Sequence, residues 1–139
     1  IKIIQHCLPH QNSELSSFYK KSNIEHELFN FSDNLIQFFS KVNLAITRSG
    51  SSVLAELTNA NIPFISIPLP SSVDDHQLKN ATFYKNKNFS FLVEEKDLND
   101  KLLNLLKEIS FSLGISLKQI INIEIFCKIE EANKHSSSG

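Results

Sequence analysis

Residues 44–67 read LAITRSGSSVLAELTNANIPFISI, and this stretch decides the fold. Its first four residues, 44–47, form a short apolar run that is typical of a buried strand. Residues 51–59 then carry apolar side chains at helical spacing, and a serine at 51 or 52 begins this predicted helix. A second apolar run follows at 64–67, directly after a proline. A strand, a helix and another strand joined by short loops predict a βαβ unit with parallel strands.

The same alternation continues on both sides of this unit. Further strands are predicted at residues 2–6, 26–29 and 89–93, and further helices at 12–21, from Ser32 to about 39, at 74–87, and from the capping residue Asp97 to 109. This alternation predicts an α/β fold, a Rossmann-like parallel sheet with helices on both faces. In such sheets, ligands bind beyond the carboxyl ends of the strands. The functional residues are therefore expected in the loops that follow strands.

The domain that carries this pattern is expected to span residues 1–110. Beyond it, residues 115–129 are apolar at mixed spacing, and residues 135–139 read HSSSG. Neither stretch has a clear helical or strand period. We therefore expect residues 111–139 to form a tail that is poorly ordered or that needs a partner surface to fold.

The composition excludes several functional classes. The chain has 139 residues, a formal net charge of -1 and 41% hydrophobic residues, as expected for one globular domain. This charge offers no basic surface, so no nucleic-acid partner is expected. Cys7 and Cys127 lack the spacing of metal ligands and are read as reduced thiols. Pro9 lies between His6 and His10 and disfavours a shared helix face, so no metal or cofactor is expected.

A candidate phosphate site lies in the loop between the predicted strand at 44–47 and the helix that follows it. Gly50 lets the backbone turn and approach a ligand closely, and unpaired N–H groups at a helix start bind anions such as a diphosphate. Arg48 adds positive charge beside this loop. An ordinary capped turn with a surface arginine is the alternative interpretation. Glu56, further along the helix, could accept both hydroxyls of a ribose or could be a solvated helix glutamate.

A second candidate site follows the next predicted strand. Gln77 and Asn80 are three residues apart, so they share one face of a helix. Two neighbouring amides can donate to and accept from sugar hydroxyls without carrying charge. Asp74 and Asp75 lie at the helix start, where negative charge is favoured, so a capping role is the alternative for them. The neighbouring His76 is either a general base or a polar residue beside the site.

These motifs, taken in order, resemble the bacterial MurG family of glycosyltransferases. The resemblance rests on TRSGSSVLAEL at 47–57, IP at 62–63, IPLP at 67–70, DDHQ at 74–77 and NA at 80–81. It is strong over residues 29–93. It implies the C-terminal domain of a two-domain glycosyltransferase of GT-B architecture. That family transfers N-acetylglucosamine from UDP-N-acetylglucosamine to undecaprenyl-linked muramoyl-pentapeptide, converting lipid I to lipid II in peptidoglycan synthesis.

The resemblance also implies a role for each donor-binding position. It implies recognition of uracil by the backbone at Ser32 and binding of the ribose by Glu56. It implies that the diphosphate lies against Ser51, Ser52, Val53, Leu54 and Ala55, with Arg48 nearby, and that Gln77 and Asn80 read the N-acetylglucosamine hydroxyls. No metal is implied, because backbone amides and a helix dipole stabilise the departing diphosphate instead. No catalytic residue is implied in this sequence, because the family's catalytic base belongs to its N-terminal domain.

Departures from the family pattern limit what this chain is expected to do. The family's N-terminal domain, with its acceptor loop and the histidine thought to act as base, is not in the sequence, and a glycine-rich strand and loop should precede Ile1. Asn61 replaces a family glycine at a helix end, where asparagine tolerates a left-handed backbone.

We therefore expect a fragment that binds the donor and is inactive alone. Contact with the acceptor and with the inner face of the plasma membrane, on the cytoplasmic side, would come through the missing domain. Two alternatives remain. One is a stand-alone donor-binding subunit of a split UDP-N-acetylglucosamine transferase, and the other is a non-catalytic nucleotide-binding domain.

Overall fold

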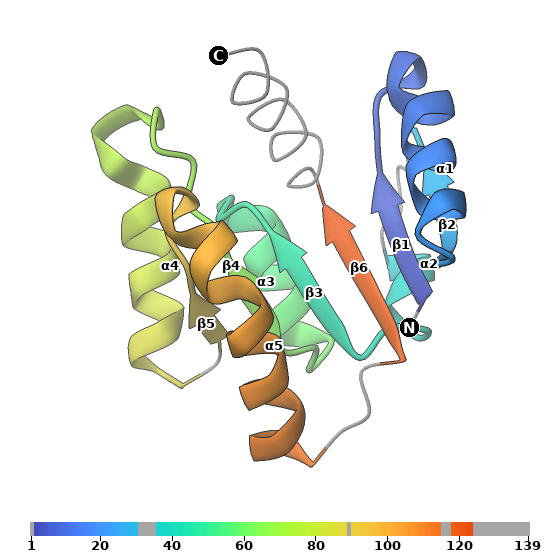
Figure 1. The fold of residues 1–139 in the computed structure, drawn as a ribbon. Coiled ribbons are helices and arrows are strands. Elements are labelled where there is room, and N and C mark those ends of the chain that lie inside the picture. The colour runs from blue at the N-terminus through green and yellow to red at the C-terminus, as the bar shows by residue number, and fades with distance from the viewer. Residues whose placement is uncertain (1, 31–35, 89, 115–117, 124–139) are drawn as a thin grey trace.

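In the part of the chain that the structure describes, six parallel strands form a single sheet in the order β2-β1-β6-β3-β4-β5 (Figure 1). The structure is a computed structural model that describes residues 2–30, 36–88, 90–114 and 118–123. In chain order its elements are β1 (Lys2–His6), η1 (Pro9–Gln11), α1 (Asn12–Lys21), β2 (Glu25–Phe29), α2 (Ile36–Phe39), β3 (Leu44–Thr47), α3 (Ser51–Asn59), β4 (Phe64–Ser66), η2 (Val73–Asp75), α4 (His76–Asn86), β5 (Ser90–Leu92), η3 (Glu95–Asp97), α5 (Leu98–Leu113) and β6 (Gln119–Ile123).

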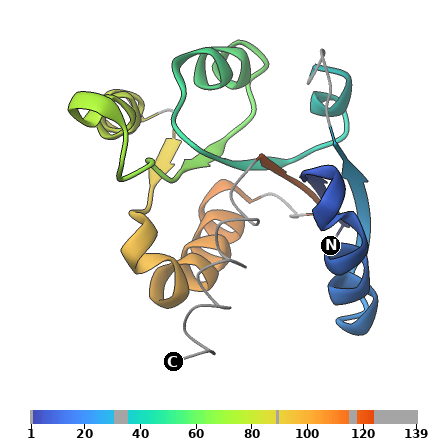
Figure 2. The same ribbon diagram turned by 90° about the horizontal axis from the view of Figure 1, so that it is seen from above.

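Helices cover both faces of the sheet (Figure 2). The helices α2, α3 and α4 lie on one face, and α1 and α5 lie on the other. On the first face, Leu54 and Leu57 of α3 belong to one core cluster with Phe64 of β4. On the second face, Ile109 of α5 belongs to another cluster with Ile65 of β4. Successive strand residues thus point to opposite faces, and the predicted α/β fold is confirmed.

The strand β6 occupies the centre of the sheet, between β1 and β3. The expectation of a poorly ordered tail from residue 111 is wrong for residues 119–123, and α5 itself continues to Leu113. A short strand that is buried on both faces has no alternating pattern, so its periodicity cannot distinguish it from a helix segment. Its strand partners are also distant in the sequence. Residues 124–139 lie outside the described residues.

One row of buried side chains runs across β1, β6, β3 and β4. In the strand register, Ile4 pairs with Ile121, which also pairs with Ala45, and Ala45 pairs with Phe64. All of these residues are 0% exposed and lie in the core beneath α2 and α3. The next residue of β6, Ile120, lies in the core on the α5 side. The central strand therefore contributes to the cores on both faces.

Most element boundaries agree with the sequence predictions. β1, α1, β3 and α3 have the predicted bounds, and β2 and β4 differ by one residue. Asn61 has a φ of 57°, so this asparagine does adopt a left-handed backbone. The helix predicted from Asp74 begins at His76 instead, because Asp74 and Asp75 have φ values of 51° and 54°. Ser32 and the predicted start of its helix lie outside the described residues.

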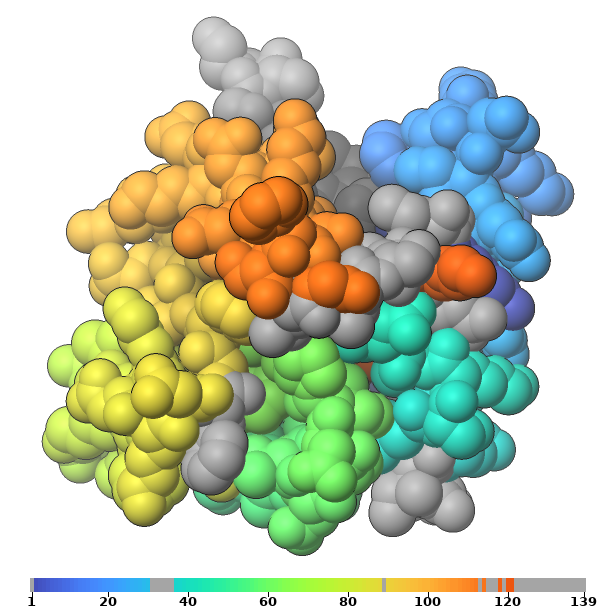
Figure 3. Space-filling view, turned by 90° about the horizontal axis from the view of Figure 1, so that it is seen from below, coloured from blue at the N-terminus to red at the C-terminus, as the bar shows by residue number. Residues whose placement is uncertain are grey.

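The parallel arrangement brings the loops that follow the strands to one edge of the sheet. These loops are residues 48–50 after β3, 67–72 after β4 and 93–94 after β5. The opposite edge is covered by the C-terminal ends of α3, α4 and α5 (Figure 3). The carboxyl edge is where a ligand of such a sheet is expected to bind.

Ile121→Ala tests the central placement of β6. The substitution removes a fully buried side chain, so we expect the free energy of unfolding to fall by about 2–5 kcal/mol. Leu103→Ala on α5, where the side chain is 64% exposed, is the matched control, and it should change this free energy by less than about 0.5 kcal/mol. Chemical denaturation measures both variants. Equal effects of the two substitutions would contradict the placement.

Candidate functional site

The loop between β3 and α3 presents the start of a helix at the carboxyl edge of the sheet. The N-cap residue Gly50 precedes Ser51, and as a glycine it has no side chain that could accept a hydrogen bond from the helix. Ser51 and Ser52 are both exposed. The first N–H groups of α3 are therefore not capped by the N-cap side chain, which is the arrangement that binds anionic groups at a helix start.

The turn itself does not require glycine at position 50. Gly50 has a φ of -65° and a ψ of 141°, a conformation that any residue can adopt. A Cβ atom placed there would meet only Val53 Cγ1, at 3.9 Å, which is an ordinary contact. The predicted need for glycine in the turn is therefore wrong. The remaining reason for glycine is that the absent side chain lets a ligand approach the backbone.

Two amide side chains of α4 hold this loop. Gln77 Oε1 accepts hydrogen bonds from the backbone N–H groups of Ser49, at 3.2 Å, and of Leu69, at 2.9 Å. Asn80 Nδ2 donates to the backbone oxygen of Ser49 at 3.0 Å. The structure thus brings both predicted amides to the β3–α3 loop. Within the described residues, Gln77 Nε2 and Asn80 Oδ1 make no hydrogen bond, so they remain available to a ligand.

Arg48 lies elsewhere than the sequence interpretation placed it. The residue is 6% exposed, and its Nη1 donates to the backbone oxygens of Ile67, at 3.2 Å, and Pro68, at 3.3 Å. Its Nη2 pairs with Glu95 Oε1 at 3.0 Å. Neither a surface arginine nor a charge offered directly to a diphosphate fits this geometry. A buried guanidinium needs acceptors for its donors, and the loop after β4 and Glu95 of η3 supply them.

The remaining predicted donor contacts lie along α3. Glu56 and Ala55 are exposed, and Val53 is half-buried. Leu54 is fully buried in the core, so it can offer a ligand only its main chain. Because α3 and α4 cover the same face, Glu56 and Gln77 lie on the same side of the sheet (Figure 2). Their placement is compatible with a shared ligand.

The start of α4 is built differently from the predicted acidic cap. Ser72 Oγ, not an aspartate, accepts the backbone N–H of Gln77 at 3.3 Å. Asp75 takes the N-cap position with a left-handed backbone and makes no side-chain cap bond. Asp74, Asp75 and His76 are all exposed. The loop reaches α4 through left-handed residues, and this geometry prevents the ordinary carboxylate cap.

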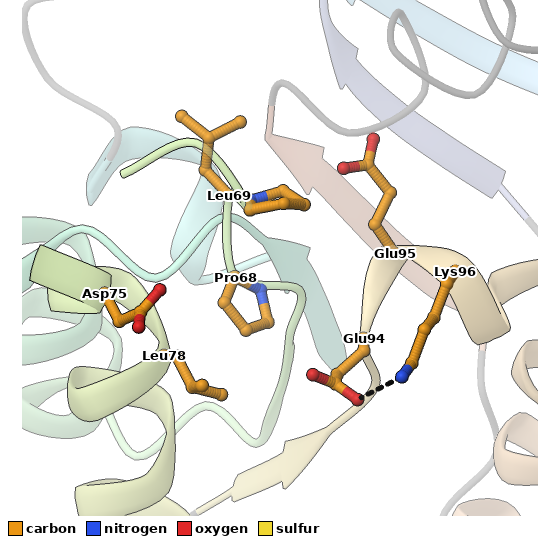
Figure 4. A pocket seen from close by; sticks show the side chains of 8 residues that line it. Pro68, Leu69, Asp75, Leu78, Glu94, Glu95 and Lys96 are labelled. Atoms are coloured by element: carbon orange, nitrogen blue, oxygen red, sulfur yellow. Dashed lines mark ion pairs between the residues drawn. The ribbon is translucent and has the colours of Figure 1, made fainter. Parts of the chain in front are cut away.

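A cavity of about 270 Å³ lies beside these loops (Figure 4). It is lined by Pro68, Leu69, Pro70, Asp75, Leu78, Glu94, Glu95 and Lys96. Glu94, which is half-buried, pairs with the exposed Lys96 at 3.6 Å. The sequence interpretation missed Glu95, because it lies 47 residues from its partner Arg48 and no local pattern indicates the pair.

The described part of the chain was also compared with the requirements of a metal site, a membrane-spanning helix and a reactive thiol. Residues 2–30, 36–88, 90–114 and 118–123 contain no cluster of three or more His, Cys, Asp or Glu side chains suited to a metal ion. Within the same residues, no helix has the length and apolar character to cross a membrane. Burial raises the pKa of the Cys7 thiol above its ordinary value, while a hydrogen bond with Asn12 acts in the opposite direction. A protonated, buried thiol is a poor nucleophile.

Comparison with known proteins identifies the family of this chain. Residues 1–113 match the model of the glycosyltransferase family 28 C-terminal domain. A relative from Pelagibacter ubique is 41% identical over 103 residues, which cover 74% of this chain and 29% of the relative. One from Rickettsia massiliae is 34% identical over 111 residues, which cover 76% of this chain and 30% of the relative. Both are named UDP-N-acetylglucosamine–N-acetylmuramyl-(pentapeptide) pyrophosphoryl-undecaprenol N-acetylglucosamine transferase.

A solved structure supports the fold independently. The crystal structure of Acinetobacter baumannii MurG superposes with a TM-score of 0.69 at 24% identity, covering 80% of this chain and 33% of that one. The chain thus spans about 30% of the length of the curated relatives it matches. Since the family model covers most of the sequence, this chain belongs to glycosyltransferase family 28 and carries its C-terminal domain.

Proposed function

We propose that this chain is the donor-binding half of an N-acetylglucosaminyltransferase and that it holds UDP-N-acetylglucosamine. The observation that carries the proposal is the loop of residues 48–50, which Gln77 and Asn80 fix to α4 so that the start of α3 faces the carboxyl edge. The names of the Pelagibacter and Rickettsia relatives supply the sugar nucleotide and the reaction.

The diphosphate and the ribose have candidate partners on α3. The diphosphate would accept hydrogen bonds from the backbone N–H groups of Ser51, Ser52 and Val53, where the helix dipole also favours negative charge. Glu56 would accept the ribose hydroxyls. The backbone at Ser32 would read uracil, as the family resemblance implies.

The sugar would bind at the atoms of α4 that the loop does not use. Gln77 Nε2 is a donor and Asn80 Oδ1 is an acceptor, so together they can bond hydroxyl groups in both senses. Both residues are half-buried, which limits competition from water. Discrimination of N-acetylglucosamine from other sugars would therefore depend on a small number of hydrogen bonds at the start of α4.

Transfer of the sugar also requires an acceptor site and a catalytic base, and the proposal places neither of them in this chain. A hydroxyl of an undecaprenyl-linked muramoyl-pentapeptide attacks the anomeric carbon in one inverting displacement, a base removes its proton, and UDP leaves. The α3 start stabilises the departing diphosphate without a metal. The acceptor site, the base and contact with the inner face of the plasma membrane are assigned to the remainder of a full-length protein.

Titration of the purified chain with nucleotide sugars tests the proposal. We expect weak binding of UDP-N-acetylglucosamine, markedly weaker binding of an ADP-sugar, and no transfer of the sugar by this chain alone. Isothermal calorimetry measures the affinities, and a radiolabelled donor with a lipid-linked acceptor measures transfer. Equal affinity for both nucleotides would favour a general nucleotide-binding domain. Transfer by the isolated chain would identify a self-sufficient enzyme.

Two substitutions at Gln77 separate its structural role from its proposed role in sugar binding. Gln77→Glu keeps an acceptor for the N–H groups of Ser49 and Leu69 but cannot donate to a sugar hydroxyl. It should keep the parent's stability while the preference for UDP-N-acetylglucosamine over UDP falls about tenfold, the equivalent of roughly 1.4 kcal/mol. Gln77→Leu leaves both N–H groups without an acceptor and should lower the free energy of unfolding by about 1–3 kcal/mol.

Thermal unfolding and calorimetry with the two ligands provide these measurements. The charge that Gln77→Glu introduces would weaken both ligands, so the ratio of their affinities is the quantity compared. An unchanged ratio would remove Gln77 from the sugar site. Equal stability of Gln77→Leu and the parent would show that the loop does not depend on this amide.

A further inference from the structure

We propose that Glu95 is a positioning residue for the donor diphosphate, acting through Arg48 on the loop that leads into α3. The inference rests on the proposed donor site and adds a residue outside it. Glu95 belongs to the connection between β5 and α5, whereas the loop it would position follows β3. The ion pair therefore joins two loops at the carboxyl edge of the sheet.

The contacts of Arg48 give the physical connection. Its guanidinium bonds the backbone oxygens of Ile67 and Pro68 and the carboxylate of Glu95. Its own backbone is joined to Ser49, whose N–H and C=O groups are both bonded by α4. A shift of the Arg48 side chain would therefore displace the peptide that precedes Gly50 and the start of α3.

Among the hydrogen-bond partners of the Arg48 guanidinium, Glu95 is the one that carries the opposite charge. The Arg48 side chain is 8% exposed and the Glu95 side chain is 33% exposed, so water reaches the pair mainly from the carboxylate side. A buried cation that loses its counter-charge is strongly disfavoured. Without the carboxylate, Arg48 would gain from moving toward solvent and away from the backbone oxygens that it bonds. Glu95 thus keeps the guanidinium beside the loop after β4, where its fork of donors can bond separate acceptors.

The adjacent Glu94 provides a matched control. It has the same charge and lines the same cavity (Figure 4), but its partner is Lys96, at 3.6 Å. The side chains of Glu94 and Lys96 are 45% and 76% exposed, and a pair of this kind contributes little to stability. Neutralising Glu94 changes the net charge as much as neutralising Glu95 does, without touching Arg48.

The experiment compares the parent chain with Glu95→Gln and Glu94→Gln, using UDP and uridine as ligands. UDP carries the diphosphate and uridine does not, so a shift of the α3 loop should affect only UDP. We expect Glu95→Gln to weaken UDP binding about tenfold, to leave uridine binding unchanged and to remain folded at the assay temperature. Glu94→Gln should bind both ligands like the parent. Calorimetry measures UDP binding, ligand-observed NMR measures uridine binding, and circular dichroism checks folding.

A double-mutant cycle tests whether Glu95 acts through Arg48. If it does, Glu95→Gln should have no further effect on UDP affinity in an Arg48→Gln background. Parent-like UDP binding by Glu95→Gln would overturn the inference. So would an equal loss for uridine and UDP, which indicates general damage, or additive effects in the cycle. Failure of the parent chain itself to bind UDP would refute the proposed donor site, and the inference with it.

Discussion

The pairing of β6 with both β1 and β3 is the constraint on which the rest of this structure depends. Among the described strands, β6 is the only hydrogen-bonded link between the β2-β1 pair and the β3-β4-β5 group. Neighbouring strands lie about 4.8 Å apart, so β6 holds β1 and β3 at roughly twice that separation. The relative position of the loops on either side of the sheet centre, and hence any site that uses both, is set by this strand.

Side chains at the candidate site further fix the position of the loop after β3. The loop after β3 is held by side chains rather than by its own turn geometry. Gln77 and Asn80 of α4 bond the Ser49 peptide, and the Arg48–Glu95 pair ties the same loop to the loop after β4 and to η3. A helix start that is already fixed does not have to be ordered when a ligand binds, which favours affinity. It also favours stabilisation of the charge that develops on a leaving diphosphate.

Much of the fold followed from local sequence patterns. Short apolar runs and helical spacing located β1, β3, α1 and α3 to the residue, because each element has its own period and clear boundaries. The pattern was uninformative for β6, whose buried faces carry no alternation and whose partners are distant in sequence. Asp74 and Asp75 also read as part of a helix, because composition alone does not reveal a left-handed backbone.

The sequence predicted which loops form the candidate site, but it did not predict all of the side-chain contacts within the site. The pairing of Gln77 and Asn80 follows from their helical spacing, and their position beside Ser49 follows from parallel topology. The burial of Arg48 could not be foreseen, because it depends on Glu95 and on two backbone oxygens from other loops. These groups are far apart in the sequence. They come together only in the folded chain, where the loops meet at the carboxyl edge of the sheet.

The central claim is that the start of α3 holds the donor diphosphate, and amide chemical-shift mapping tests it most directly. In a ¹⁵N-labelled chain titrated with UDP, the account predicts that the amide signals of Ser51, Ser52 and Val53 shift most. Those three N–H groups would change from solvent to phosphate partners. Saturable UDP binding that leaves these three signals unmoved while shifting signals elsewhere would contradict the account.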